Sequence, residues 1–192
     1  MDQTLSALSE EISSIAKKSG AVLIGTTQIY RVEKVIVIGT PLNENWRLSF
    51  AFSEAKRVTE EYRITRPLLN NISKALKREG FKAEHKTPLS VYGDFRPLAV
   101  AAGLGYYGRN GLVINKNYSS GVVFSAIFTN APVEIVEKPN MLKCADCGLC
   151  VRLCPANALS EGRLNFKKCL PYSLRGCSQC LKACGYAIDE DV

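Results

Sequence analysis

The sequence predicts an α+β fold in which a mixed-sheet domain, residues 1–138, is followed by a small cysteine-rich domain, residues 139–192. Apolar segments of helical and strand type follow one another in mixed order over the first domain, unlike the regular alternation of a doubly wound parallel sheet. All eight cysteines lie between Cys144 and Cys184, so the chemistry of the chain changes near EKPNML at 137–142. A chain of 192 residues is long enough for one good-sized core and a small second domain.

An amphipathic helix and two buried strands are expected first. KKSG supplies the basic last turn and the C-terminal glycine of the helix. AVLIG at 21–25 and KVIVIG at 34–39 are short, apolar and β-branched, which is typical of buried strands. The apolar stripe of the helix consists of Leu5, Leu8, Ile12 and Ile15.

Two further helices are expected before residue 80. SEAKRVTEEY at 53–62 fits a helix with a polar face. Pro67 suits the first turn of a second helix, where its missing N–H is no loss, and Gly80 ends that helix. The stripe of the second helix is Leu68, Leu69, Ile72 and Leu76.

The remainder of the first domain is predicted as strand, helix and two strands. FKAEHK at 81–86 is a candidate strand, and RPLAVAAGLG at 96–105 indicates a buried helix that runs into a glycine turn. GLVINK at 111–116 and GVVFSAIFT at 121–129 are strand-like and close enough, through NYSSG, to form a hairpin.

Composition favours a globular cytoplasmic protein. The hydrophobic fraction is 46%, and no apolar run reaches the roughly 18 residues of a membrane-spanning helix. The start, MDQTLSALSEEISS, lacks the basic end and apolar core of a secretory signal. In the cytoplasm thiols stay reduced, so the cysteines are more typical of metal ligands or catalysts than of disulfides.

The first group of cysteines has the spacing C-x2-C-x2-C-x3-C-P, which is the run of bacterial-type ferredoxins. Three cysteines at steps of three residues can wrap a tight loop around three corners of one cubane. The fourth cysteine points away to bind a second cubane, and the proline turns the chain there. The group consists of Cys144, Cys147, Cys150 and Cys154.

The second group has the spacing C-x7-C-x2-C-x3-C and looks like the partner motif with a longer first interval. The ferredoxin pattern implies two 4Fe–4S clusters with crossed ligation. Two all-thiolate zinc sites and disulfides are the alternatives, although structural zinc usually uses two separated C-x2-C pairs. The expected ligand sets are Cys144, Cys147, Cys150 and Cys184 for one cluster, and Cys154, Cys169, Cys177 and Cys180 for the other.

The formal net charge is +7, and residues 56–86 hold nine Lys or Arg against four Glu. Such a run is typical of a solvated helix face. The alternative is a docking face for RNA, an acidic electron donor or an anionic cofactor, although no RNA-recognition motif accompanies it.

A glycine-rich stretch, AAGLGYYGRNGLVI at 101–114, is the second informative feature. GLGYYG matches G-x-G-x-x-G, but it follows a predicted helix and precedes a strand, which is the reverse of a dinucleotide site. It is either a tight helix-to-strand turn or a cofactor-lining loop, because glycines permit positive φ and close backbone approach. The candidate cofactor-binding residues are Gly103, Gly105, Tyr106, Tyr107, Gly108, Arg109 and Asn110.

Residues 101–134, followed by the eight-cysteine pattern with CP and CLPYS, resemble the epoxyqueuosine reductases and, more distantly, the reductive dehalogenases. The family's glycine stretch is close to A-G-L-G-W-I-G-K-N, and this chain has Tyr106 and Tyr107 for W-I and Arg109 for the lysine. The resemblance implies a nitroreductase-like first domain that holds cobalamin, with flavin as the alternative. It also implies two clusters that pass single electrons to cobalt, and removal of an epoxide oxygen from a modified tRNA base.

The chain departs from the family pattern in two places. The family's acidic residue should fall near Leu89 or Ser90, and the nearest acid here is Asp94. Asp94 is the candidate catalytic proton donor, or else a loop or helix-capping residue. Family members usually continue into a helical C-terminal domain that helps hold tRNA, and here Gly185 replaces the usual proline after the last cysteine. Redox chemistry is therefore expected to carry over more readily than tRNA as a partner.

Two functions are consistent with these features. The first is a cobalamin-dependent iron–sulfur reductase that acts on a small molecule or a modified nucleoside. It would receive its electrons from an electron-donor protein or another reductant. The second is a non-catalytic, ferredoxin-like electron carrier or activator that docks a redox or corrinoid partner.

His85, the only histidine, is expected to be an exposed strand residue, with cobalt ligation or proton relay as alternatives. Arg96 and Arg109 are expected to contact an anionic cofactor side chain or a phosphate, or to pair with carboxylates.

Overall fold

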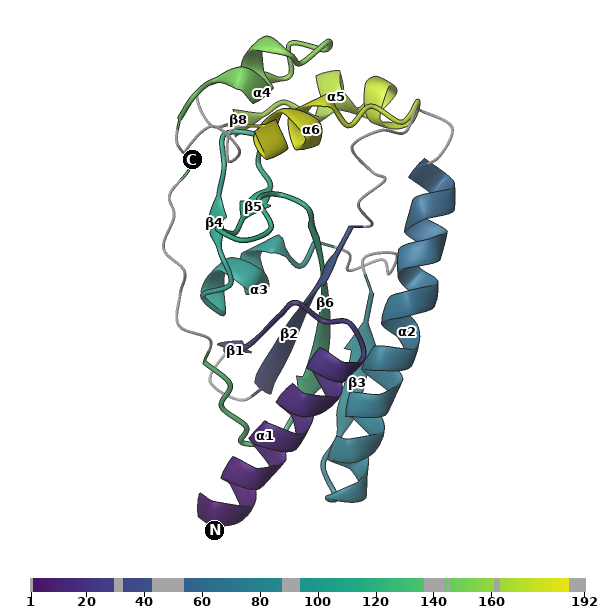
Figure 1. Ribbon diagram of the computed structural model, residues 1–192, viewed down its shortest axis with the longest axis vertical. Helices are drawn as coiled ribbons and strands as arrows, with labels where there is room; N and C mark the ends of the chain where they lie inside the picture. Colours follow the sequence, from purple (N-terminus) through teal and green to yellow (C-terminus); the bar gives the residue numbers. More distant parts are fainter. Residues whose placement is uncertain are drawn as a thin grey trace. The chain divides into compact units, whose positions relative to one another are not determined.

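The computed structural model describes residues 2–29, 33–42, 54–87, 94–136, 144, 146–160 and 163–186. These residues form helices and strands in mixed order, so the predicted α+β class is confirmed (Figure 1). No described helix is both long and apolar enough to cross a membrane. The elements are α1 (Asp2–Lys18), β1 (Leu23–Ile29), β2 (Glu33–Pro41), α2 (Glu54–Arg78), β3 (Ala83–Lys86), α3 (Arg96–Ala101), β4 (Tyr106–Tyr107), β5 (Val113–Ile114), β6 (Val122–Thr129), α4 (Leu149–Arg152), β7 (Leu159–Ser160), β8 (Arg163–Leu164), α5 (Phe166–Ser173) and α6 (Gln179–Tyr186).

The chain divides into two compact units, and neither is continuous in sequence. We call them the sheet unit and the cysteine unit. The glycine-rich stretch from Gly105 onward belongs to the cysteine unit, and the predicted boundary between residues 138 and 139 stays a prediction. The sheet unit contains Met1–Pro41, Glu60–Leu104 and Val123–Pro139, and the cysteine unit contains Leu42–Thr59, Gly105–Val122 and Asn140–Val192.

A four-stranded sheet in the order β1-β2-β6-β3 forms the centre of the sheet unit. β1 and β2 are antiparallel, with Leu23 opposite Gly39, and β3 and β6 are antiparallel, with Ala83 opposite Thr129. Helices α1 and α2 pack on this sheet and bury their apolar stripes, each large side chain contributing about 1.5–3 kcal/mol. The fully buried core side chains include Ile12, Ile24, Ile36, Ile38, Leu68, Leu69, Ile72, Leu76 and Ile127.

Glycines end the two long helices as predicted. Gly20 and Gly80 have φ of 91° and 83°, a conformation that other L-residues rarely adopt. The amide of Ala21 donates to the Ala16 oxygen and that of Phe81 donates to the Leu76 oxygen, which is the hydrogen-bond pattern of a Schellman cap.

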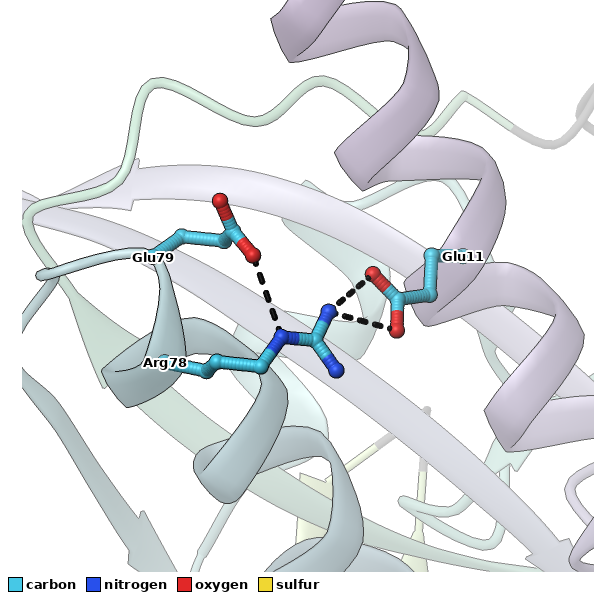
Figure 2. A network of polar contacts seen from close by, with 3 residues as sticks. All are labelled: Glu11, Arg78 and Glu79. Carbon is cyan, nitrogen blue, oxygen red and sulfur yellow. Dashed lines mark hydrogen bonds and ion pairs between the residues drawn. The ribbon is translucent and has the colours of Figure 1, made fainter.

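Arg78, the last residue of α2, pairs with Glu11 in the middle of α1 (Figure 2). Its Nη2 donates to both carboxylate oxygens of Glu11 in α1, at 2.9 and 2.8 Å, and its Nε donates to Glu79 at 3.1 Å. The bond to Glu11 is the largest cause of the raised pKa of Arg78. Because the arginine is exposed, this pairing orients the helices more than it stabilises them.

Two sequence predictions about elements are wrong. Residues 54–62 of the first predicted helix and the stripe after Pro67 form one helix, α2, with the proline inside it. Burial of the stripe residues from Leu68 to Leu76 outweighs the loss of one backbone hydrogen bond.

The predicted hairpin of the last two strands does not form either, because β5 pairs with β4 whereas β6 enters the large sheet between β2 and β3. β6 is buried along most of its length, so it needs neighbours on both edges.

The charged stretch is a solvated helix face where its side chains are described. Arg66, Lys74, Lys77 and Arg78 are exposed on α2, opposite the buried stripe. The basic side chains before residue 65 lie outside the described ones.

Candidate functional site

Three thiols lie near Cys150 in the cysteine unit. Burial is the largest cause of the raised pKa of Cys150, and negative charge on Cys144, Cys184 and Cys147 raises it further. A thiol is affected in this way only by charges that lie near it. Cys144, Cys147, Cys150 and Cys184 therefore form one neighbourhood, in which Cys147 is exposed and Cys150 is buried.

The remaining three thiols lie near Cys180. Burial raises the pKa of Cys180 to about 11, with further contributions from Cys177, Cys169 and Cys154. The pKa of Cys169 is also raised, first by burial and then by Cys154 and Cys177. These neighbours form a second set of four that shares no cysteine with the first.

The two neighbourhoods coincide with the two crossed ligand sets expected from the sequence, and the ligand roles themselves stay a prediction. In the described part of the chain, no three His, Cys, Asp or Glu side chains are placed to ligate one metal ion. A cubane takes one thiolate at each of four separate irons, so its ligands stand further apart than those of a single zinc ion. Thiolates that repel each other suit such a centre, because iron offsets their charge.

Helix α6 carries one thiol of each set, Cys180 and Cys184. It packs against α4 in a small apolar cluster that includes Cys150, Leu159 and Ala183. The loop before α4 contains two left-handed residues, Asp146 with φ of 56° and Gly148 with φ of 70°. The Ala158 amide donates to the Cys154 sulfur at 3.4 Å.

The glycine-rich stretch begins as a helix cap and continues as a hairpin. Gly103, with φ of 74°, ends α3 in the sheet unit, where Leu104 donates to the Ala99 oxygen. In the cysteine unit, β4 and β5 pair through Tyr106 opposite Ile114. We call residues 105–120 the glycine hairpin.

Gly105 and Gly108 are required by the packing of this hairpin. A Cβ on Gly105 would collide with the Ile114 oxygen, and it would lie 2.8 Å from Val113 Cγ1. A Cβ on Gly108 would collide with the Ile114 side chain, and it would lie 2.9 Å from Asn110 Oδ1. Both glycines thus serve a tight turn, the simpler of the two interpretations of the stretch.

Three buried polar side chains of the hairpin donate to main-chain oxygens of α6. Asn110 Nδ2 donates to Cys180 at 3.3 Å, Ser119 Oγ to Cys184 at 3.1 Å, and Ser120 Oγ to Leu181 at 3.4 Å. Each of these donor residues is only 3% exposed. The hairpin therefore fixes the helix that carries one thiol of each set.

Two arginines border the loop of the first set. Arg109 Nε pairs with Asp146 Oδ1 at 2.6 Å, and Arg152 Nη1 donates to the Cys147 oxygen at 3.1 Å. Asp146 itself lies between Cys144 and Cys147 in sequence. Arg109 thus meets a carboxylate of the cysteine loop, which is one of the roles open to it from the sequence.

Asp94 is held as a carboxylate. Arg96 Nε and Nη2 donate to its two oxygens at 2.7 and 2.8 Å, and the Arg96 amide donates to Oδ1 at 3.2 Å. The side-chain bond from Arg96 is the largest cause of the lowered pKa of Asp94. Asp94 stands one residue before Phe95, the N-cap of α3, which makes no side-chain capping bond. It therefore bonds to the first amide of the helix from outside the cap position. Leu89 and Ser90, where the family's acid was expected, lie outside the described residues.

His85 is not the exposed residue that was predicted. It is half-buried in β3, opposite Ile127, and its Nδ1 lies 3.4 Å from Ser73 Oγ. Burial is the largest cause of its lowered pKa, followed by the charges of Lys77, Arg66 and Lys86. The residue therefore belongs to the packing between α2 and the sheet.

Sequence reasoning missed Ser119, Ser120 and Asp146. The serines stand in NYSSG, which was considered only as a connection between strands. Two small hydroxyl residues, one glycine before a buried strand, are a signal that could have been used, since such side chains often bond to main-chain groups.

Comparisons with known proteins agree with this geometry. Residues 138–160 match the 4Fe–4S binding domain family. An epoxyqueuosine reductase of Listeria monocytogenes is 34% identical over 120 residues, which cover 52% of this chain and 31% of that protein. The chain is thus similar to the epoxyqueuosine reductases, and it spans less than a third of the length of this relative.

Two solved structures have the same fold. Epoxyqueuosine reductase with an epoxyqueuosine-modified tRNA-Tyr stem loop aligns with a TM-score of 0.73 and 19% identity, over 94% of this chain and 65% of that one. A reductive dehalogenase, whose structure suggests a mechanism for B12-dependent dehalogenation, aligns with a TM-score of 0.80 and 17% identity, over 91% of this chain and 31% of that one. The predicted fold class, with a C-terminal 4Fe–4S region, is confirmed.

Proposed function

We propose that this protein is an iron–sulfur reductase that passes single electrons through two 4Fe–4S clusters toward a bound cofactor, cobalamin. The observation that carries the proposal is the arrangement of eight thiols in two sets, joined by α6 and hydrogen-bonded to the glycine hairpin. The match of residues 138–160 to a 4Fe–4S binding domain supports the clusters. The likeness to epoxyqueuosine reductases supports reductive chemistry.

The chain's own residues would hold and connect these groups. Cys144, Cys147, Cys150 and Cys184 fit one cluster, and Cys154, Cys169, Cys177 and Cys180 fit the other. The pKa of Cys150, Cys169 and Cys180 is raised, so cluster assembly releases protons from these thiols. Since α6 supplies one ligand to each cluster, its position sets the separation between them.

The glycine hairpin is the candidate cofactor-facing segment. When bound, cobalamin would supply a low-valent cobalt centre that donates electrons to substrate, and flavin is the alternative group. Asn110 uses both amide atoms inside the protein, accepting from the Leu112 amide at 3.1 Å and donating to Cys180. It is therefore a positioning residue, and Tyr106 and Tyr107 are the better candidates for contact with a cofactor. Arg109 would reach a cofactor only by leaving Asp146 or by using its other guanidinium nitrogens.

Asp94 is the candidate proton donor, but its pairing limits that role. A carboxylate with a lowered pKa carries no proton near neutral pH. Donation by Asp94 requires its pair with Arg96 to open when substrate binds. The substrate class is a modified nucleoside, by analogy with the reductase solved with a tRNA stem loop.

Anaerobic EPR of the iron-reconstituted protein with added cob(II)alamin tests the proposal. A protein-bound, base-off cobalt signal at about one per chain is expected, together with reducible clusters. A cobalt signal identical to that of free cofactor, with clusters that reduce normally, would favour a ferredoxin-like electron carrier that docks a redox or corrinoid partner. The pairing of Asp94 is the observation that keeps this alternative open.

A further inference from the structure

Helix α5 exposes a stripe of large apolar side chains. Phe166, Leu170 and Leu174 are 63%, 38% and 79% exposed. They follow one another at intervals of four residues, so they lie on one face of the helical turn. None of the residues of α5 is buried.

The same helix carries Cys169, a member of the second thiol set. Eight residues of helix extend only about 12 Å, so a molecule seated on the stripe is close to that thiol. Exposed apolar groups that cluster beside a redox centre are typical of an interaction site rather than of an ordinary solvated surface.

The segment that carries the stripe, residues 164–184, has charged residues of one sign only. Lys167, Lys168 and Arg175 are exposed, and no Asp or Glu occurs in the sequence from Leu164 to Cys184. An apolar centre with a basic rim complements a partner that has an apolar centre and an acidic rim.

We propose that the α5 stripe, Phe166, Leu170 and Leu174 with its basic rim, is the docking surface for an acidic one-electron carrier protein of the ferredoxin or flavodoxin class. The inference rests on the proposed iron–sulfur function and adds the partner and its place of contact. One electron leaves the reduced carrier and enters the oxidised cluster of the second set. The carrier is oxidised by one electron and the cluster is reduced by one, with no bond made or broken.

A small stripe suits this kind of partner. Electron-transfer encounters bury little surface and dissociate quickly, so a few apolar residues with a charged rim are sufficient. Attraction between the opposite charges speeds encounter, and added salt screens it.

Anaerobic stopped-flow reduction of the reconstituted full chain by flavodoxin hydroquinone tests the proposal. Phe166→Ser and Leu174→Ser change the stripe, and the double variant Lys167→Glu/Lys168→Glu reverses part of the rim. Val136→Ser is the matched control, since Val136 is an 80% exposed apolar residue of the sheet unit. Dithionite serves as a small reductant that needs no docking surface.

We expect the second-order rate with flavodoxin to fall at least tenfold in the stripe and rim variants and to decrease with salt in the wild type. Dithionite rates, iron content and the Val136→Ser control should not change.

Unchanged flavodoxin rates in the stripe and rim variants would overturn the proposed docking surface. The clusters, and with them the proposed function, would then still stand. Equal losses with dithionite, or a wild-type dimer that Phe166→Ser dissociates, assign the stripe to folding or to a second copy instead. Absence of iron overturns both proposals.

Discussion

Asn110 Nδ2 donates to the main-chain oxygen of Cys180 at 3.3 Å, and this bond joins the glycine hairpin to the helix that carries one thiol of each set. Asn110 is 3% exposed, so its amide has no water to replace a lost partner. Ser119 makes the matching bond to Cys184. The hairpin therefore holds both neighbouring cysteines of α6 at once.

Replacing Asn110 by alanine should loosen α6 and labilise both clusters. The loss of a buried donor and acceptor is expected to lower the free energy of unfolding by about 1–3 kcal/mol. Anaerobic thermal unfolding and the rate of iron release to a chelator measure the effect. Asn110→Asp keeps the acceptor for Leu112 but loses the donor, so it should also release iron faster. Lys116→Ala, exposed in the same hairpin, is the control and should behave as the wild type. Wild-type iron release by Asn110→Ala would refute the role.

A methyl group at Gly108 should destabilise the hairpin through its contact with Ile114. Gly108→Ala is expected to cost about 1–3 kcal/mol, which is typical of overpacking. Trimming the neighbour in Gly108→Ala/Ile114→Ala should recover part of that loss relative to the sum of the single variants. Denaturant unfolding of the four proteins of this cycle gives the coupling energy. Strict additivity would mean that Ile114 does not limit the space at Gly108.

The lowered pKa of His85 predicts a pH dependence of stability below its ordinary value. In the folded protein the imidazole stays neutral at a pH where the unfolded chain, with a pKa near 6.5, takes up a proton. Proton uptake therefore favours unfolding, and stability should be lost as pH falls below about 6.5. His85→Gln should flatten this part of the profile. Since His85 is the only histidine, denaturation midpoints from pH 7 to 5 are a direct measurement. A wild-type profile that is flat, or that the substitution leaves unchanged, would argue against a half-buried imidazole that stays neutral in the folded protein.

The pairing of Asp94 with Arg96 predicts how the candidate proton donor titrates. The carboxyl should titrate below its ordinary pKa in the wild type and closer to it in Arg96→Gln, because the largest stabilising bond is removed. Carbon-detected NMR of the carboxyl carbon follows this titration. Stability should change by less than about 1 kcal/mol, as for other exposed pairs. Equal titration midpoints in both proteins would show that Arg96 does not control Asp94.

The sequence predicts correctly those features that depend on neighbouring residues in the chain. The caps at Gly20 and Gly80 follow from backbone conformation alone, and the stripe from Leu68 to Leu76 follows from helical spacing. The error at Pro67 arose because tertiary burial outweighed a local helix-starting preference. The error over the hairpin arose because strand pairing depends on which edges are free in the whole sheet.

Some features of the candidate site could likewise be predicted from the sequence, and others depend on contacts made only on folding. The two thiol sets could be expected because the cysteine spacing reflects the shape of the centre that it surrounds. The bonds from Asn110, Ser119 and Ser120 to α6 could not be expected, since residues more than 60 positions apart meet only after folding. The partner of Arg109 depends likewise on the turn at Asp146.

The crossed arrangement of the two thiol sets is tested most directly by iron analysis of two double variants. Cys150→Ser/Cys184→Ser removes two members of one set, whereas Cys180→Ser/Cys184→Ser removes one member of each. Reconstituted anaerobically, the first protein should keep one 4Fe–4S cluster, with roughly four irons per chain, and the second should keep neither intact. The same iron content and the same EPR spectrum in both variants, with one intact cluster in each, would contradict the arrangement.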